Sequence, residues 1–227
     1  MTSYVFKING ERNSGTTFLT NLICINFNDY FEHKIIDDVC YYWKHGVPDN
    51  TVKNYIENKT VVDIFVFRNL NDWLVSMIYN PYHLVPFYDF QLFLENKQYS
   101  CETQLTEHCS NKILNYDDND KTIFEIRYYK FNSIIDYFNN NDNVILVNLE
   151  YLQNNENCLH FLNTLNNKFN LNKNSDELIT SLEHTKIFTN EKNRKYEINA
   201  SNYQNIINQY KNDEIENFIN NLTFIVK

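Results

Sequence analysis

Residues 4–17 have the sequence YVFKINGERNSGTT, and its pattern indicates the class of fold. Apolar and polar residues alternate over 4–9, which predicts a strand, and Gly10 opens a loop. Apolar residues at helical spacing follow over 16–25 and predict a helix. A strand, a glycine-bearing loop and a helix in this order offer backbone N–H groups and a helix N-terminus to an anion. We therefore expect a phosphate loop over 9–17.

The loop GERNSGTT has the spacing GxxxxGK(S/T), except that Thr16 stands at the lysine position. That lysine is the group that reaches a β- or γ-phosphate, so its absence disfavours ATP hydrolysis and phosphoryl transfer by the usual arrangement. The alternative interpretation is a plain strand-to-helix turn, with Gly15 present for tight packing and Ser14 or Thr16 as the N-cap.

A second segment repeats the pattern of a buried strand that leads into a helix. The near-continuous apolar run TVVDIFVF at 60–67 predicts a strand covered on both faces, and a helix follows over 71–79. Arg68 ends the strand, and Ser76 lies further along the helix. Their guanidinium and hydroxyl groups can converge on one phosphate, although a surface arginine and a helix-face serine fit equally well. Two anion sites predict a ligand with two separated phosphates.

The remaining pattern alternates between strands and helices. We expect a short strand at 34–39, a helix at 123–138, a buried strand at 143–149, a helix at 158–169, and two short helices or one interrupted helix at 202–221. Residues 87–120 are interpreted as an insertion or lid where the acceptor is selected. This alternating order of strands and helices predicts one α/β domain over 1–227, with a parallel sheet between two layers of helices. Ligands of such sheets bind at the carboxyl ends of the strands.

Composition excludes several classes of function. The net charge of -9 repels phosphate backbones, so nucleic acid is not an expected partner. No run approaches 18 apolar residues and the first residues lack a signal-peptide pattern, so a cytoplasmic protein without a membrane span is expected.

The 5 cysteines have no metal-binding spacing, and reduced thiols are expected. Abundant Asn, with only 3 Gly and 3 Pro, indicates an A/T-rich genome.

Together the two segments resemble the sulfotransferases that use 3′-phosphoadenylyl sulfate (PAPS). SGTT at 14–17 resembles the family's loop for the 5′-phosphosulfate, and Arg68 with Ser76 resembles its 3′-phosphate site. Four further stretches look like the smaller branch of the family: WKHG at 43–46 with Pro48, PYH at 81–83, EIRYYK at 125–130 and NLEYL at 148–152. The resemblance covers roughly the first 150 residues. Many members have lysine immediately before SGT, where this chain has Asn13.

The resemblance implies a P-loop-type fold and in-line transfer of a sulfuryl group from PAPS to a hydroxyl or amine, without metal. The released product would be adenosine 3′,5′-bisphosphate. The implied cofactor-binding residues are Arg12, Asn13, Ser14, Gly15, Thr16, Thr17, Arg68 and Ser76. His45 is the implied general base, with His83 as its rival. Lys44 and Arg12 are the implied cations at the sulfuryl group and the bridging oxygen.

Other candidates stay open on the sequence alone. Tyr82, His83 and Arg127 are candidate substrate contacts. Arg127 and Lys130 share a helix face, which fits contact with a nucleotide or an acidic acceptor as well as it fits a solvated basic stripe. Core packing is favoured over adenine stacking for Trp43 and Trp73. The nearest counterparts of the family's basic loop that closes on the 3′-phosphate are Lys192, Arg194 and Lys195.

Two rival functions remain. A nucleotide or small-molecule kinase is disfavoured by Thr16 and by the lack of a clear magnesium-binding carboxylate after a strand. A catalytically degenerate nucleotide-binding or scaffold protein stays open because of Asn13. The acceptor is a small molecule, a glycan or a tyrosine, and the sequence does not choose among them.

Overall fold

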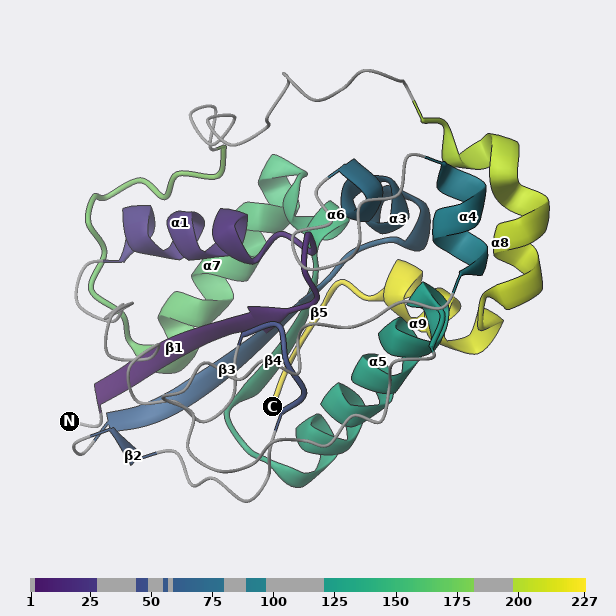
Figure 1. Ribbon diagram of the computed structural model, residues 1–227. Coiled ribbons are helices and arrows are strands. Elements are labelled where there is room, and N and C mark those ends of the chain that lie inside the picture. Colours follow the sequence, from purple (N-terminus) through teal and green to yellow (C-terminus); the bar gives the residue numbers. More distant parts are fainter. Residues whose placement is uncertain are drawn as a thin grey trace.

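The computed structural model describes residues 3–27, 44–48, 55–56, 59–79, 89–96, 121–181 and 198–227. These residues form an α/β arrangement (Figure 1). Its elements are β1 (Ser3–Gly10), α1 (Thr16–Asn26), β2 (Tyr55–Ile56), β3 (Lys59–Phe67), α3 (Leu70–Tyr79), α4 (Phe90–Glu95), α5 (Ile123–Asn140), β4 (Val144–Asn148), α6 (Leu149–Leu152), α7 (Asn155–Phe169), the 3-10 helix η4 (Ala200–Tyr203), α8 (Gln204–Tyr210), α9 (Asp213–Asn221) and β5 (Phe224–Val226).

The strands form one five-stranded sheet in the order β1-β3-β4-β5, with β2 also paired to β3. β1, β3 and β4 run parallel, whereas β2 and β5 are antiparallel to their neighbours. The register aligns Gly10 with Val66 and Phe67 with Asn148. The segments that follow the three parallel strands therefore begin at the same edge of the sheet.

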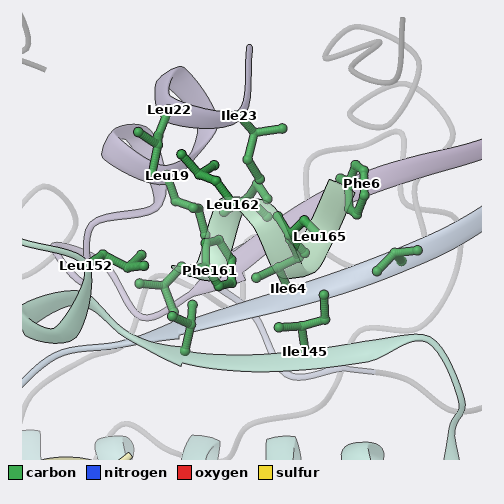
Figure 2. Close-up of a cluster of buried hydrophobic side chains, with 14 of the residues drawn as sticks. Phe6, Leu19, Leu22, Ile23, Ile64, Ile145, Leu152, Phe161, Leu162 and Leu165 are labelled. Carbon is green, nitrogen blue, oxygen red and sulfur yellow. The ribbon is translucent and has the colours of Figure 1, made fainter. Parts of the chain in front are cut away.

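Helices cover both faces of the sheet. One core joins Phe6, Ile64 and Ile145 to α1 and α7, and Figure 2 shows Phe161 and Leu162 of α7 among these side chains. The other core joins the opposite strand face to α5 and α9, which Figure 1 shows across the sheet from α1 and α7. Because side chains alternate along a strand, the apolar residues of β3 and β4, interrupted within β3 by Asp63, contribute to both cores. A third cluster joins α3, α4, η4 and α8.

Most predicted elements are confirmed within a few residues. The confirmed elements are the strands at 4–9, 60–67 and 143–149 and the helices at 16–25, 71–79, 123–138 and 158–169, and the tail forms two short helices. The insertion 87–120 is described only at 89–96, which contain α4, and the strand expected at 34–39 lies outside the described residues. Two short antiparallel strands were not predicted: the two-residue β2 and the three-residue β5. No described helix is long and apolar enough to cross a membrane.

Candidate anion-binding site

The loop between β1 and α1 leaves the N-terminus of the helix without a side-chain cap. Asn13 and Gly15 take left-handed conformations, with φ of 61° and 99°, and the amide of Ser14 donates to the carbonyl of Glu11 at 3.1 Å. Gly15 is the N-cap of α1, and no side chain caps the helix. The sequence-based alternative in which Ser14 or Thr16 caps α1 is therefore wrong. The uncapped end presents the positive pole of the helix dipole at the edge of the sheet.

Both loop glycines sit where a side chain has no room. A Cβ on Gly10 would lie 2.6 Å from the carbonyl oxygen of Val66 in β3. A Cβ on Gly15 would lie 2.6 Å from Cδ1 of Leu149, and the left-handed backbone there strains any residue with a side chain. The loop is thus packed closely against the end of β3 and the first residue of α6.

Ser14 supplies a buried hydroxyl to this loop. The residue is 0% exposed, and its Oγ has no hydrogen-bond partner within the described part of the chain. Buried polar groups in folded proteins nearly always have a partner. A bound oxygen atom at the loop would satisfy the hydroxyl, so the residues present fit an anionic group.

The structure brings the two predicted anion-binding segments into direct contact. Nη1 of Arg68 donates to Oγ of Ser76 at 2.6 Å and to the carbonyl of Asn13 at 3.1 Å. The Asn13 amide donates back to the carbonyl of Ser76 at 3.3 Å. The Arg68 side chain remains 23% exposed. One guanidinium therefore joins the end of β3, the helix α3 and the loop, and part of it faces solvent.

Glu150 lies beside this arginine and was not assigned a role from the sequence. Its Oε1 lies 3.6 Å from Nε of Arg68, and its Oε2 accepts from the backbone N–H of Asn69 at 3.1 Å. Burial raises the pKa of Glu150, although Asn69 and Arg68 counteract part of the shift. Its place directly after the strand at 143–149 was the signal that could have found it, because parallel strands end at one edge.

Arg127 is a buried connector beneath the loop. Its Nη1 donates to Glu11 at 2.6 Å, its Nε donates to Glu216 of α9 at 2.8 Å, and its Nη2 donates to the carbonyl of Arg68 at 2.8 Å. The guanidinium lies 4.7 Å from the ring centroid of Trp73. The alternative in which Arg127 and Lys130 form a solvated basic stripe is wrong, because both side chains are buried. Contact of Arg127 with a ligand stays a prediction.

Trp73 belongs to the core, as the sequence favoured. It is buried, and its indole N–H donates to the carbonyl of Arg12 at 2.8 Å. The Trp73 side chain thus links α3 to the loop through this hydrogen bond, and the face of its ring packs against Arg127. The aromatic side chain is engaged by the protein itself rather than presented to a ligand.

His45 is placed next to the loop. The amide of Gly10 donates to the carbonyl of Lys44 at 2.8 Å, and the Gly10 carbonyl lies 2.8 Å from Nδ1 of His45. A carbonyl can only accept, so Nδ1 carries the proton and Nε2 carries the lone pair. Burial, assisted by the positive charges of Lys44, Arg12 and Lys130 and opposed by the hydrogen bond to Gly10, lowers the pKa of His45 to about 3. The imidazole is therefore neutral at pH 7.

Lys130 completes the group of charges around the loop. It is 6% exposed, and burial lowers its pKa to about 8, opposed by Glu11 and assisted by Arg12. Burial also raises the pKa of Glu11, against the attraction of Arg127 and Lys130. The helical spacing of Arg127 and Lys130 could be recognised in the sequence. Their acidic neighbours Glu11 and Glu216 could not, because these residues lie far away in the chain and no local sequence pattern links them to α5.

Several candidates from the sequence lie outside the described residues: Trp43, Tyr82, His83, Lys192, Arg194 and Lys195. Among the described candidates, Thr16 is buried and Thr17 is exposed at the first turn of α1. Both belong to the N-terminal turn, where backbone N–H groups lack partners within the helix.

Comparison with known proteins gives no relative: no family model matches the chain, and no curated protein or solved structure matches it significantly. The chemistry of the site therefore follows from its own residues. They provide a helix N-terminus with a buried hydroxyl, a partly exposed arginine held by a serine, and a neutral imidazole among positive charges.

Proposed function

We propose that the protein is a P-loop-type sulfotransferase that uses PAPS as its donor. The observation that carries the proposal is the 2.6 Å bond from Arg68 to Ser76, made directly beside the uncapped loop before α1. The same guanidinium also donates to the carbonyl of Asn13. These contacts support a ligand that carries two anionic groups, and the order of the segments along the chain resembles that of the PAPS-dependent family.

Each end of the donor has a set of residues that would hold it. The loop amides, the Ser14 hydroxyl and the first turn of α1, with Thr16 and Thr17, would hold the 5′ end. Arg68 and Ser76 would hold the 3′-phosphate, where a forked guanidinium makes strong charge-assisted bonds. When bound, PAPS would supply the sulfuryl group and a phosphate leaving group.

His45 is suited to accept a proton from the acceptor. Its neutral ring keeps a lone pair on Nε2, since Nδ1 donates to Gly10. A pKa of about 3 makes the free imidazole a weak base. Anionic groups at the loop would offset the positive charges of Lys44, Arg12 and Lys130 and raise the pKa of His45. Proton abstraction would thus be strengthened when the donor site is filled.

A turnover assay tests the proposal. The protein is incubated with PAPS and a panel of phenols, sugars, amines and tyrosine peptides, and release of adenosine 3′,5′-bisphosphate is measured. We expect acceptor-dependent release that His45→Ala and Arg68→Ala abolish. Lys211→Ala, which removes a partly buried lysine paired with the exposed Asp213, should retain it. Release of ADP from ATP with magnesium would favour the kinase instead. Nucleotide binding without transfer to any acceptor would favour the scaffold protein.

A further inference from the structure

A partly buried carboxylate lies beside the arginine of the predicted anion site, and the proposed function does not use it. Oε1 of Glu150 lies 3.6 Å from Nε of Arg68, and Oε2 accepts from the backbone N–H of Asn69 at 3.1 Å. The turn from β4 into α6 fixes this position. Asn148 caps α6 by accepting from the N–H of Tyr151 at 3.1 Å, and its amide donates to Oδ1 of Asn69 at 3.1 Å. Glu150 is thus held at the edge of the sheet where Arg68 follows β3.

The contact between Glu150 and Arg68 is an ion pair rather than a hydrogen bond. Its length of 3.6 Å exceeds the range of a hydrogen bond. Oε1 and Nε are both buried, and neither makes a hydrogen bond to any described group. The attraction between opposite charges is therefore the interaction that joins the two side chains. This attraction is substantial where the protein partly excludes water.

Other groups already orient the guanidinium. Nη1 of Arg68 donates to Oγ of Ser76 at 2.6 Å and to the carbonyl of Asn13 at 3.1 Å. Nη2 makes no hydrogen bond within the described part of the chain. The Ser76 hydroxyl accepts from Arg68, so its own hydrogen is available to an acceptor. Nη2 and this hydrogen are the donors left for an anion, whether or not Glu150 is charged.

The carboxylate therefore contributes charge to the site rather than orientation. It offsets the positive charge of Arg68, and it repels an oxyanion bound to the same guanidinium. Burial raises the pKa of Glu150, and Asp72 adds to the rise, whereas Asn69 and Arg68 oppose it. A raised pKa indicates that Arg68 compensates the negative charge of Glu150 only in part. A second anion at Arg68 would leave Glu150 with less compensation still.

We propose that Glu150 competes with a bound oxyanion, a phosphate or a sulfate group, for the charge of Arg68 and thereby limits how tightly that anion is held. The identity of the anion as the 3′-phosphate of a nucleotide rests on the proposed function, whereas the competition does not. In a PAPS-dependent enzyme, the competition would speed the release of adenosine 3′,5′-bisphosphate.

Calorimetric titration at pH 7 with inorganic sulfate and with adenosine 3′-monophosphate tests the competition. Glu150→Gln keeps an acceptor for the N–H of Asn69 and removes the charge, so it should bind both probes about 3- to 10-fold more tightly than the wild type. A residue that only held Arg68 in place would give weaker binding when changed. Asp72→Asn is the matched control, because it removes an exposed carboxylate from the first turn of α3 and should change both affinities by less than about twofold. Arg68→Ala should weaken both probes.

The pH dependence of sulfate binding gives a second readout, because sulfate keeps its charge between pH 7 and 5. Protonation of Glu150 removes the competing charge, so the affinity of the wild type should rise as the pH falls toward the raised pKa of Glu150. The charged groups that face Glu150 among the described residues are Arg68 and Asp72. Arg68 stays charged throughout, and Asp72→Asn should keep the rise. Glu150→Gln should reduce the rise, and any slope left in that variant belongs to other groups.

The outcomes separate this inference from the proposed function. Equal or weaker binding of both probes by Glu150→Gln, or an equal gain in Asp72→Asn, would overturn the competition. If Glu150→Gln does not fold, the pH series on the wild type decides, and an affinity for sulfate that stays flat or falls would overturn it.

Two further outcomes concern the nucleotide. If sulfate binds as expected but adenosine 3′-monophosphate does not bind, the competition stands and the PAPS proposal fails. If adenosine 3′-monophosphate binds through Arg68 and Glu150→Gln does not strengthen it, the competition is wrong and the PAPS proposal stands. If neither probe binds to the wild type or to Glu150→Gln, both are wrong.

Discussion

Nη1 of Arg127 lies 2.6 Å from Oε2 of Glu11, and both side chains are buried. The same guanidinium binds Glu216 on α9. The pair therefore connects α5 and α9 to the first residue of the loop at the end of β1. An ionic contact in this position fixes where the loop begins relative to the helices behind it.

Replacing Arg127 with Met should destabilise the fold strongly. The change leaves Glu11 and Glu216 buried without their partner, which typically costs about 3–5 kcal/mol. Urea unfolding measures the change. The matched control is Lys211→Met, because its 2.8 Å pair with the exposed Asp213 is open to solvent on one side, and its loss should cost less than about 1 kcal/mol. Similar small losses in both variants would contradict the role of Arg127.

Ser76→Ala should weaken binding of adenosine 3′-monophosphate with little effect on folding. The hydroxyl is only partly buried and holds Arg68 through the 2.6 Å bond. Loss of a charge-assisted hydrogen bond typically costs about 1.5–3 kcal/mol, which calorimetry resolves easily. Ser133→Ala removes another helix hydroxyl, one that donates to the carbonyl of Tyr129, and should leave binding unchanged. Equal affinity in Ser76→Ala and the wild type would show that Ser76 takes no part.

Gly15→Ala should destabilise the protein by about 1–2 kcal/mol through backbone strain alone, because its φ is 99°. The added Cβ would also meet the side chain of Leu149. Adding Leu149→Ala to Gly15→Ala separates the two effects, since it relieves the contact and leaves the strain. Thermal unfolding of the variants gives both contributions. A Gly15→Ala protein as stable as the wild type would rule out the left-handed conformation.

His45 should make folding stability fall in acid. Its pKa is about 3 in the folded protein and near 6.5 in the unfolded chain, so the unfolded state binds more protons between these values. The stabilising contribution is complete above pH 6.5 and declines by up to about 1.4 kcal/mol per pH unit as the pH falls toward 3.

Urea unfolding between pH 7 and 4 measures this contribution. His45→Gln should flatten the decline, whereas the same change at the exposed His160 on α7 should keep it. A decline unchanged by His45→Gln would mean that the imidazole is not held neutral by burial.

The sequence predicted the layered α/β fold because its signals are local. The apolar runs of β3 and β4 and the helical spacing after Gly15 each extend over a single element. β5 was missed because a three-residue strand of half-buried and exposed side chains carries no such signal. Helix geometry and the position of the strand end predicted that Arg68 and Ser76 could converge on one phosphate. The structure shows the two side chains bonded to each other, and the phosphate site stays a prediction.

The charge arrangement was not predictable in the same way. Arg127 meets Glu11 and Glu216, which lie 116 and 89 residues away in the chain. No local pattern connects these positions, so burial of Arg127 and Lys130 on one helix face was not anticipated. The burial and low pKa of His45 likewise depend on tertiary packing. These long-range contacts determine the chemistry around the loop.

The most direct test of the proposed PAPS site is a calorimetric titration with adenosine 3′,5′-bisphosphate, compared with ADP and with ATP plus magnesium, on the wild type and Arg68→Ala. The melting temperature is followed in parallel, because a ligand that binds only the native state must raise it. We expect selective binding of the bisphosphate, weakened by about 10- to 100-fold in Arg68→Ala. Preference for ATP with magnesium, or bisphosphate binding that does not depend on Arg68, would contradict the account.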